Sequence, residues 1–199
     1  MFLKKFETLM HYSLPTIINY HYLAYPLMPA EPLISSLPPK IPRLQVIALM
    51  KIVDSYTTLK TSDIEIIEKK LGITLPKDYR KFLLQNNGGK PIPDAVKLEG
   101  EYFDYVACFY GIRSSNYSDD LFRNVREYDG YIPPHYLPIG ESPGGDIYCL
   151  SLIAEELGAV YYWDHELANY EGDPWEENMI KLAPALTEFL AGLYHEQNT

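Results

Sequence analysis

The side chains best suited to nucleophilic or metal chemistry in this sequence are two cysteines and five histidines. The histidines do not form the H-x-x-x-H or H-E-x-x-H spacing that places two metal ligands on one face of a helix. His165 lies between Asp164 and Glu166, but successive residues of a strand point to opposite faces, so the imidazole would not join the two carboxylates. We interpret this triplet as the end of a strand entering a loop. The sequence therefore predicts no catalytic residue, no metal site and no cofactor.

A glycine-rich segment at residues 140–146, GESPGGD, could be mistaken for a phosphate-binding loop. It lacks the lysine and the following helix of a P-loop, and Glu141 and Asp146 would repel phosphate. A structural role fits better. Gly144 and Gly145 let the chain turn sharply between two strands, and the Asp146 carboxylate accepts hydrogen bonds from backbone N–H groups of the turn.

Acidic residues surround both tryptophans in the C-terminal part of the chain, a pattern that favours binding of a basic partner. Carboxylates steer such a partner, and an exposed tryptophan anchors it. Trp163, at a strand end, fits the core better, whereas Trp175 follows a Gly-Asp-Pro turn and is the better candidate for exposure. The predicted partner-binding residues are Trp163, Asp164, Glu166, Glu171, Asp173, Trp175 and Glu176, with a second acidic cluster at Asp119 and Asp120. That second cluster has the alternative role of complementing a helix dipole.

The net charge of −10 over 199 residues is unevenly distributed. Residues 1–49 hold four basic and two acidic residues, which leaves 13 basic and 25 acidic residues, a net charge of −12, on residues 50–199. Such an acidic chain repels phosphate backbones, so we expect no direct binding of nucleic acid. It would attract a basic protein, although acidity also serves solubility.

The first 49 residues differ in kind from the rest, because they contain seven of the 16 prolines and show no periodicity. We interpret residues 1–49 as a Pro-rich irregular extension, and residues 50–199 as the folded domain. Met50 is the expected start of translation, and export by a signal peptide is the less favoured alternative. Peptides from upstream of Met50, found in protein from the native host, would contradict the Met50 start.

Hydrophobic periodicity and turn residues predict a single α+β domain. Its sheet should be mixed or largely antiparallel, with about five to six strands, and packed with about four helices. Ser62 and Glu65 have the spacing of a capping box for the first helix. Helices are predicted at residues 62–71, 76–86 and 118–128 and after Pro184, and strands at 95–98, 102–110, 136–139, 146–150 and 159–164.

Residues 71–89, LGITLPKDYRKFLLQNNGG, encode one helix together with both of its ends. Pro76 suits the first helical position, Tyr79 and Phe82 share the buried face, and a left-handed Gly88 or Gly89 closes the helix. This block resembles the LG..LP.dyr.fl...NGG signature of the SMI1/KNR4 family, also called the SUKH superfamily. A second block, LPIG at 137–140 with GGDIYCL and GAVYYWDHE further on, resembles the same family. The residues that we expect to determine the fold are Pro76, Tyr79, Phe82, Asn87, Gly88, Gly89, Gly144, Gly145 and Asp146.

The resemblance implies a non-catalytic binding protein. Many bacterial members of the family are immunity proteins that neutralise a cognate toxin, often a nuclease, and a nuclease is the kind of basic partner that the charge favours. The alternatives are a regulatory or scaffold protein of the kind that fungal members provide in cell-wall synthesis and, more remotely, an unrecognised enzyme. The sequence leaves the oligomeric state open.

Cys108 and Cys149 each lie in an apolar, strand-like run without C-x-x-C spacing, which is typical of buried free thiols in a reducing compartment. The alternative, a disulfide between neighbouring strands, is not decided by the sequence. No run approaches the roughly 20 apolar residues of a membrane helix. We therefore expect a cytoplasmic protein that has no membrane partner.

Overall fold

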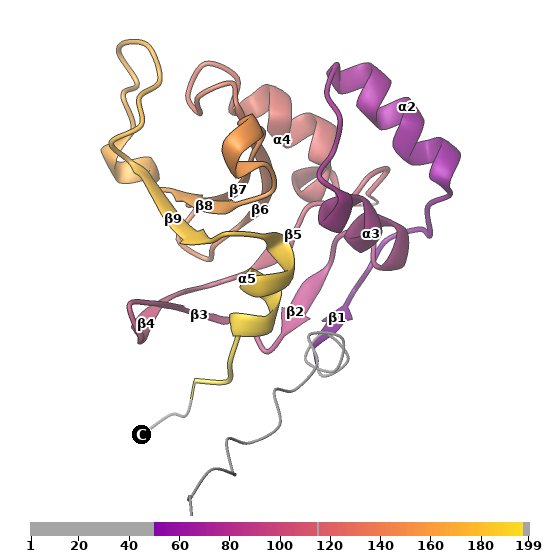
Figure 1. Cartoon of the computed structure of the whole chain (residues 1–199), viewed down its shortest axis with the longest axis horizontal. Coiled ribbons are helices and arrows are strands. Elements are labelled where there is room, and N and C mark those ends of the chain that lie inside the picture. Colours follow the sequence, from indigo (N-terminus) through magenta and orange to yellow (C-terminus); the bar gives the residue numbers. More distant parts are fainter. Residues whose placement is uncertain (1–49, 115, 197–199) are drawn as a thin grey trace, which may run out of the picture. The chain divides into compact units, whose positions relative to one another are not determined.

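A computed structural model describes residues 50–114 and 116–196. The predicted extension, residues 1–49, lies outside the described residues. The described residues form an α+β domain, which confirms the predicted fold class (Figure 1). None of the helices among them is both long and apolar enough to cross a membrane.

The centre of the domain is a five-stranded antiparallel sheet in the order β5-β6-β7-β8-β9. Neighbouring strands follow one another in sequence. Their connections range from the hairpin between β6 and β7 to residues 110–135 between β5 and β6, which contain a 3₁₀ helix and an α-helix. Two smaller antiparallel pairs, β1 with β2 and β3 with β4, accompany the central sheet. The strands are β1 (Lys51–Val53), β2 (Lys90–Ile92), β3 (Ala95–Leu98), β4 (Glu101–Tyr105), β5 (Cys108–Phe109), β6 (Tyr136–Glu141), β7 (Ile147–Ser151), β8 (Val160–Trp163) and β9 (Met179–Ala183).

Both faces of the central sheet are buried. In β7, Tyr148 and Leu150 belong to the main core, whereas Ile147 and Cys149 belong to a second apolar cluster. In β8 the same alternation holds along the strand, because successive side chains of a strand point to opposite faces. The main core includes helix residues, and the second cluster takes Ile132 and other residues from the loops around the sheet.

Four α-helices and three short 3₁₀ helices complete the described residues. Figure 1 shows α2 and α3 side by side, with α5 lying against the sheet. The α-helices are α2 (Thr61–Leu71), α3 (Lys77–Gln85), α4 (Leu121–Glu127) and α5 (Leu186–Gly192), and the 3₁₀ helices are η1 (Tyr117–Asp119), η2 (Ala154–Glu156) and η3 (His165–Leu167).

The signature helix α3 has the predicted buried face. Tyr79, Phe82 and Leu83 are at most 4% exposed, and the Phe82 ring meets the ring of Phe109 from β5 edge-on at a centroid distance of 5.1 Å. Burying three such side chains contributes several kcal/mol of hydrophobic stabilisation. Pro76 is the N-cap residue, one position before the helix.

The end of α3 corrects a prediction. The first residue in the left-handed region is Asn87, with φ of 48°, before Gly88 and Gly89. The Asn87 side chain is buried and donates hydrogen bonds to the carbonyl oxygens of Thr57 and Ile112, while it accepts one from the Ile112 N–H. Gly88 is needed for a close approach, because a Cβ there would lie 2.7 Å from the backbone nitrogen of Gly111. The NNGG motif therefore joins three chain segments.

Two helix starts also differ from prediction. Helix α2 begins after Lys60, and its first turn is capped by Asp63, which accepts a hydrogen bond from the Lys60 N–H at 2.8 Å; the Ser62–Glu65 pair does not form the cap. Helix α4 begins only after Asp120, whose carboxylate accepts from the Arg123 N–H at 3.0 Å. Ser118 belongs to η1.

The strand predictions were incomplete. The predicted strand at 102–110 is two strands, β4 and β5, in different sheets, and the buried Val106 lies between them. Strands β1, β2 and β9 were not predicted: β1 and β2 have three residues each, and all three strands contain lysine. They form because a partner strand supplies backbone hydrogen bonds, and sequence propensity does not report that partner.

Candidate partner-binding surface

The loop between β8 and β9, residues 164–178, carries most of the predicted partner-binding residues. We call it the acidic loop. It contains six carboxylates and no lysine or arginine, and Figure 1 shows it projecting beyond the strands that it joins. The exposed carboxylates are Glu166, Glu171, Asp173, Glu176 and Glu177.

Large apolar side chains are exposed among these carboxylates. Leu167, Tyr170 and Trp175 are 58%, 57% and 42% exposed. Tyr131, from the connection between α4 and β6, is 41% exposed, and its ring centroid lies 5.4 Å from that of Tyr170. Exposed aromatic rings surrounded by charges of one sign are typical of protein-binding surfaces.

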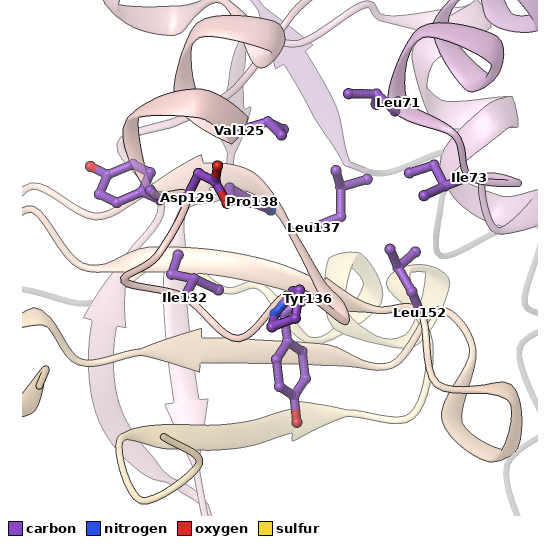
Figure 2. Close-up of a pocket in the computed structure, with 11 residues that line it drawn as sticks. Leu71, Ile73, Val125, Asp129, Ile132, Tyr136, Leu137, Pro138 and Leu152 are labelled. Atoms are coloured by element: carbon purple, nitrogen blue, oxygen red, sulfur yellow. The ribbon is translucent and has the colours of Figure 1, made fainter. Parts of the chain in front are cut away.

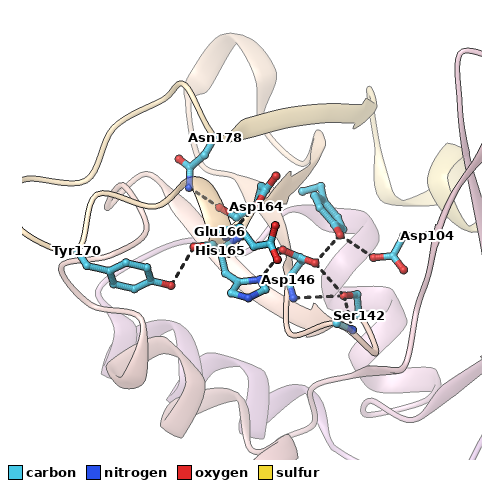
Figure 3. Close-up of polar contacts among 10 residues, drawn as sticks. Asp104, Ser142, Asp146, Asp164, His165, Glu166, Tyr170 and Asn178 are labelled. Carbon is cyan, nitrogen blue, oxygen red and sulfur yellow. Dashed lines mark hydrogen bonds and ion pairs between the residues drawn. The ribbon is translucent and has the colours of Figure 1, made fainter.

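The start of the acidic loop is held by Asp146 of the β6–β7 turn (Figure 3). Its carboxylate accepts a hydrogen bond from the backbone N–H of His165 at 3.0 Å and lies 2.8 Å from the His165 Nδ1. The other carboxylate oxygen accepts from the Tyr162 hydroxyl at 2.7 Å. Burial alone would raise the pKa of Asp146, but the hydrogen bonds from Tyr162 and His165 outweigh it and lower this pKa.

The Asp146 carboxylate accepts a hydrogen bond from a backbone N–H group, as predicted. The donor, however, is the N–H of His165 after the end of β8, and the prediction that it belongs to the β6–β7 turn was wrong. The turn is held by the hydroxyl of Ser142, which accepts from the N–H groups of Gly144 at 3.1 Å and Asp146 at 3.2 Å. Asp146 therefore connects two segments that are about 20 residues apart in sequence.

The far end of the acidic loop is held by Glu176. Its carboxylate lies 2.6 Å from the His135 Nε2 and accepts a hydrogen bond from the Tyr136 hydroxyl at 3.0 Å. Within the loop, the Trp175 indole donates to the Leu167 carbonyl at 3.0 Å, and the Tyr170 hydroxyl donates to the His165 carbonyl at 3.0 Å. These contacts give the loop a defined shape before any partner binds.

Not all predicted contact residues reach this surface. Trp163 is 1% exposed and packs edge-on against Tyr128, so it is a core residue, because its place in β8 turns it into the second apolar cluster. Asp119 is buried and accepts a hydrogen bond from the Tyr56 hydroxyl. Asp120 caps α4, which matches its alternative role. Asp164 caps η3 by accepting from the Glu166 N–H at 2.9 Å.

Residues 140–144, GESPG, fit the G-x-S-x-G pattern of hydrolase nucleophile elbows, which the sequence-based prediction of no catalytic residue overlooked. That motif needs a strand–turn–helix context with an exposed serine. Here the turn leads into strand β7, Ser142 is 3% exposed, and its hydroxyl is occupied by backbone groups. Asp146 lies between Ser142 and His165, so the histidine is not placed to take the serine proton.

Among the residues that the structure describes, two groups of side chains have the composition of metal ligands. One is Cys108, Asp119 and Glu141, and the other is Asp146, Asp164 and His165; in each, the potential ligand atoms lie within 4.8 Å of one another. Hydrogen-bond donors already contact the carboxylates in both. Burial raises the pKa of the Cys108 thiol, which disfavours the thiolate that a metal needs. We assign no ion to either group. Cys108 and Cys149 are free and buried thiols.

An apolar pocket of about 150 Å³ lies between the end of α2, α4 and β6 (Figure 2). Leu71, Ile73 and Leu152 line one side, and Val125 and Ile132 line the other. Asp129 is the only charged residue among those that line it. Its other titratable side chains are Tyr128 and Tyr136, and burial raises the pKa of both, which makes them poor proton acceptors near neutral pH.

Comparison with known proteins identifies a family to which this chain is similar. The model of the SMI1/KNR4 family (SUKH-1) matches residues 58–192. The SPbeta prophage-derived uncharacterized protein YokK of Bacillus subtilis (strain 168) is 24% identical over 160 residues, which cover 71% of this chain and 78% of YokK. A crystal structure of a protein from Pseudomonas syringae pv. tomato is 18% identical with a TM-score of 0.42, over 65% of this chain and 85% of that one. Because the family match spans more than half of the chain, and the two sequence blocks that define the resemblance lie within it, this protein belongs to the SMI1/KNR4 (SUKH-1) family.

Proposed function

We propose that this protein is a non-catalytic immunity protein that binds and neutralises a cognate toxin with a basic surface, such as a nuclease. Family membership supports the class of function, since the family is generally non-catalytic. The observation that carries the proposal for this chain is the acidic loop, which combines five exposed carboxylates with three exposed apolar side chains.

The acidic loop is the proposed contact surface. Trp175, Tyr170 and Leu167 supply the apolar contacts from which most of the affinity derives, and the carboxylates raise the association rate and select a basic partner. The anchoring of the loop at both ends reduces the conformational entropy that binding would otherwise cost. A nuclease fits because its substrate site must attract phosphate and is therefore positive.

The test is affinity purification of the tagged full chain from its native host, followed by mass spectrometry. We expect a basic protein that is recovered at low salt and depleted at high salt, and whose expression alone arrests growth unless this chain is co-expressed. Recovery of a cell-envelope or signalling protein with no toxicity would instead assign the chain to the regulatory class.

A charge-matched pair of variants locates the surface. Glu171→Lys with Asp173→Lys reverses two exposed charges of the acidic loop, whereas Glu99→Lys with Glu101→Lys reverses two exposed charges at the β3–β4 turn. We expect the first pair to lower toxin affinity at least tenfold and the second to change it less than threefold. Equal losses would show that net charge matters and the loop does not.

A further inference from the structure

Histidines lie at both ends of the acidic loop. The described residues include three histidines, His135, His165 and His195. His165 begins η3 at the start of the loop, and His135 precedes β6 and contacts the loop's far end. Each faces a carboxylate from a different segment of the chain, at 2.8 Å for His165 with Asp146 and 2.6 Å for His135 with Glu176.

The surroundings of His165 are mostly anionic. Asp146 faces it from the β6–β7 turn, and its own loop contributes Asp164 and Glu166. From the sheet, Tyr162 bonds the same Asp146 carboxylate and also Asp104 of β4, with oxygen–oxygen distances of 2.7 and 2.6 Å. The hydrogen bond with Asp146 is the largest influence, and it raises the pKa of His165 against a smaller effect of burial.

The surroundings of His135 join the loop to the sheet. Glu176 accepts from the Tyr136 hydroxyl while it faces His135. The Tyr136 ring contacts the Tyr161 ring of β8, whose hydroxyl bonds Glu156, and Glu156 in turn pairs with Lys181 of β9 at 2.6 Å. Lys181 is held by Glu156, so His135 is the basic side chain that faces Glu176 directly.

We propose that the charge state of His165 controls the order of the acidic loop, so that the start of the loop is held tightly at mildly acidic pH and loosens as the pH rises. A protonated histidine makes a charge-assisted hydrogen bond with its carboxylate, roughly twice as strong as a neutral one. Loss of the His165 proton weakens the contact with Asp146 at the start of the loop. Only the consequence for partner affinity rests on the proposed function.

The direction follows from His165. Its pKa is raised in the folded protein, so the contribution of the pair to stability is complete below the ordinary histidine pKa of about 6.5 and is lost as the pH rises through the higher folded value. The pKa of Asp146 is lowered, so its carboxylate stays ionised throughout the mildly acidic range. The loop should therefore loosen at some pH above about 6.5.

Trp175 lies in the acidic loop and reports its order without any partner. The chain has two tryptophans, so Trp163→Phe leaves Trp175 as the single emitter. We expect acrylamide quenching of Trp175 to increase about twofold between pH 6 and pH 9. Hydrogen exchange of peptides from 164–178 in the unmodified chain, normalised for the intrinsic pH dependence of exchange, gives a second measurement that needs no substitution.

A neutral variant that keeps a hydrogen-bond donor separates charge from geometry. His165→Asn places an amide near the position of Nδ1. In this variant we expect a loop that is as mobile at pH 6 as the parent is at pH 9, whereas His195→Gln should retain the parental pH dependence. A parental profile in His165→Asn, or no change of exchange in the parent between pH 6 and pH 9, would overturn the proposal. If the mobility of the acidic loop changed with pH while toxin affinity did not, the proposed control of loop order would hold. Only its effect on partner affinity would be contradicted.

Discussion

Replacing Asn87 by alanine removes a buried polar connection between three chain segments. The Asn87 amide donates to the Thr57 carbonyl at 2.6 Å and the Ile112 carbonyl at 3.0 Å, and its oxygen accepts from the Ile112 N–H at 2.8 Å. Asn87 and Ile112 are 1% and 3% exposed. Water would therefore not readily replace these bonds, and the Ile112 N–H would lose its partner.

The loss of these hydrogen bonds lowers the free energy of unfolding. Each hydrogen bond contributes about 1 kcal/mol net, and a buried group left unsatisfied costs about 1–3 kcal/mol. The left-handed φ of 48° at Asn87 adds about 1 kcal/mol for alanine. We expect Asn87→Ala to lower the free energy of unfolding by about 3–5 kcal/mol. Asn87→Gly should cost about 1 kcal/mol less than Asn87→Ala, because glycine adopts this conformation freely.

Asn86 provides the matched control in the same motif. Its amide makes one weak contact, 3.4 Å to the Phe82 carbonyl, so Asn86→Ala should cost less than about 1 kcal/mol. Urea denaturation with an unchanged slope would measure both variants. If Asn87→Ala and Asn86→Ala differed by less than 1 kcal/mol, the three hydrogen bonds would not hold the segments together, and the reasoning would be refuted.

Three further predictions concern stability. Gly88→Ala should destabilise the protein more than Gly145→Ala by thermal denaturation, because a Cβ at Gly88 would lie 2.7 Å from backbone, whereas at Gly145 it meets nothing within 4 Å and only the φ of 96° costs energy; equal losses would contradict the close approach. Trp163→Ala should cost about 3–5 kcal/mol in the free energy of unfolding, because the side chain is in the core, while Trp175→Ala should cost under about 1 kcal/mol and act on partner affinity; the reverse order would place Trp163 outside the core. Burial, followed by hydrogen bonds to Asp119 and Glu156, raises the pKa of Tyr56 and Tyr161 to about 12. The folded protein therefore keeps protons that the unfolded chain releases near pH 10, so stability should fall between about pH 10 and 12, and Tyr56→Phe should reduce this fall. Absorbance at 295 nm would reveal the late-titrating tyrosines, and their titration near pH 10 in the folded protein would contradict this.

Part of the candidate site could be predicted from composition alone. Carboxylates concentrated around Trp175 identified the acidic loop, because charge and exposure at a Gly-Asp-Pro turn need no tertiary information. The same pattern included Trp163 and Asp119, which are buried. The strand position of Trp163 already favoured the core, whereas no local pattern showed that Asp119 is buried, because its burial depends on Tyr56, a residue distant in sequence.

The anchors of the acidic loop could not be predicted. Asp146 and His165 are 19 residues apart, and His135 and Glu176 are 41 apart. The first contact forms because β7 and β8 are adjacent and antiparallel, which brings the start of β7 beside the end of β8. The second forms although the register places the starts of β6 and β9 at opposite ends of the sheet, so the acidic loop folds back toward the start of β6. The GESPG segment shows the reverse situation. Its sequence fits a catalytic motif, but the structure buries Ser142 and occupies its hydroxyl with backbone hydrogen bonds, so the motif does not form a nucleophile elbow.

By itself, the sequence determined the family, the α+β class, the helix at 77–85 and the acidic loop, because these follow from periodicity, turn residues and charge within short windows. Only the tertiary contacts revealed the two-sided core, the strands β1, β2 and β9, the role of Asn87 as a connection between three segments and the two histidine anchors. All of these depend on contacts between residues far apart in the chain, and a local pattern carries no information about which distant segment will supply the partner.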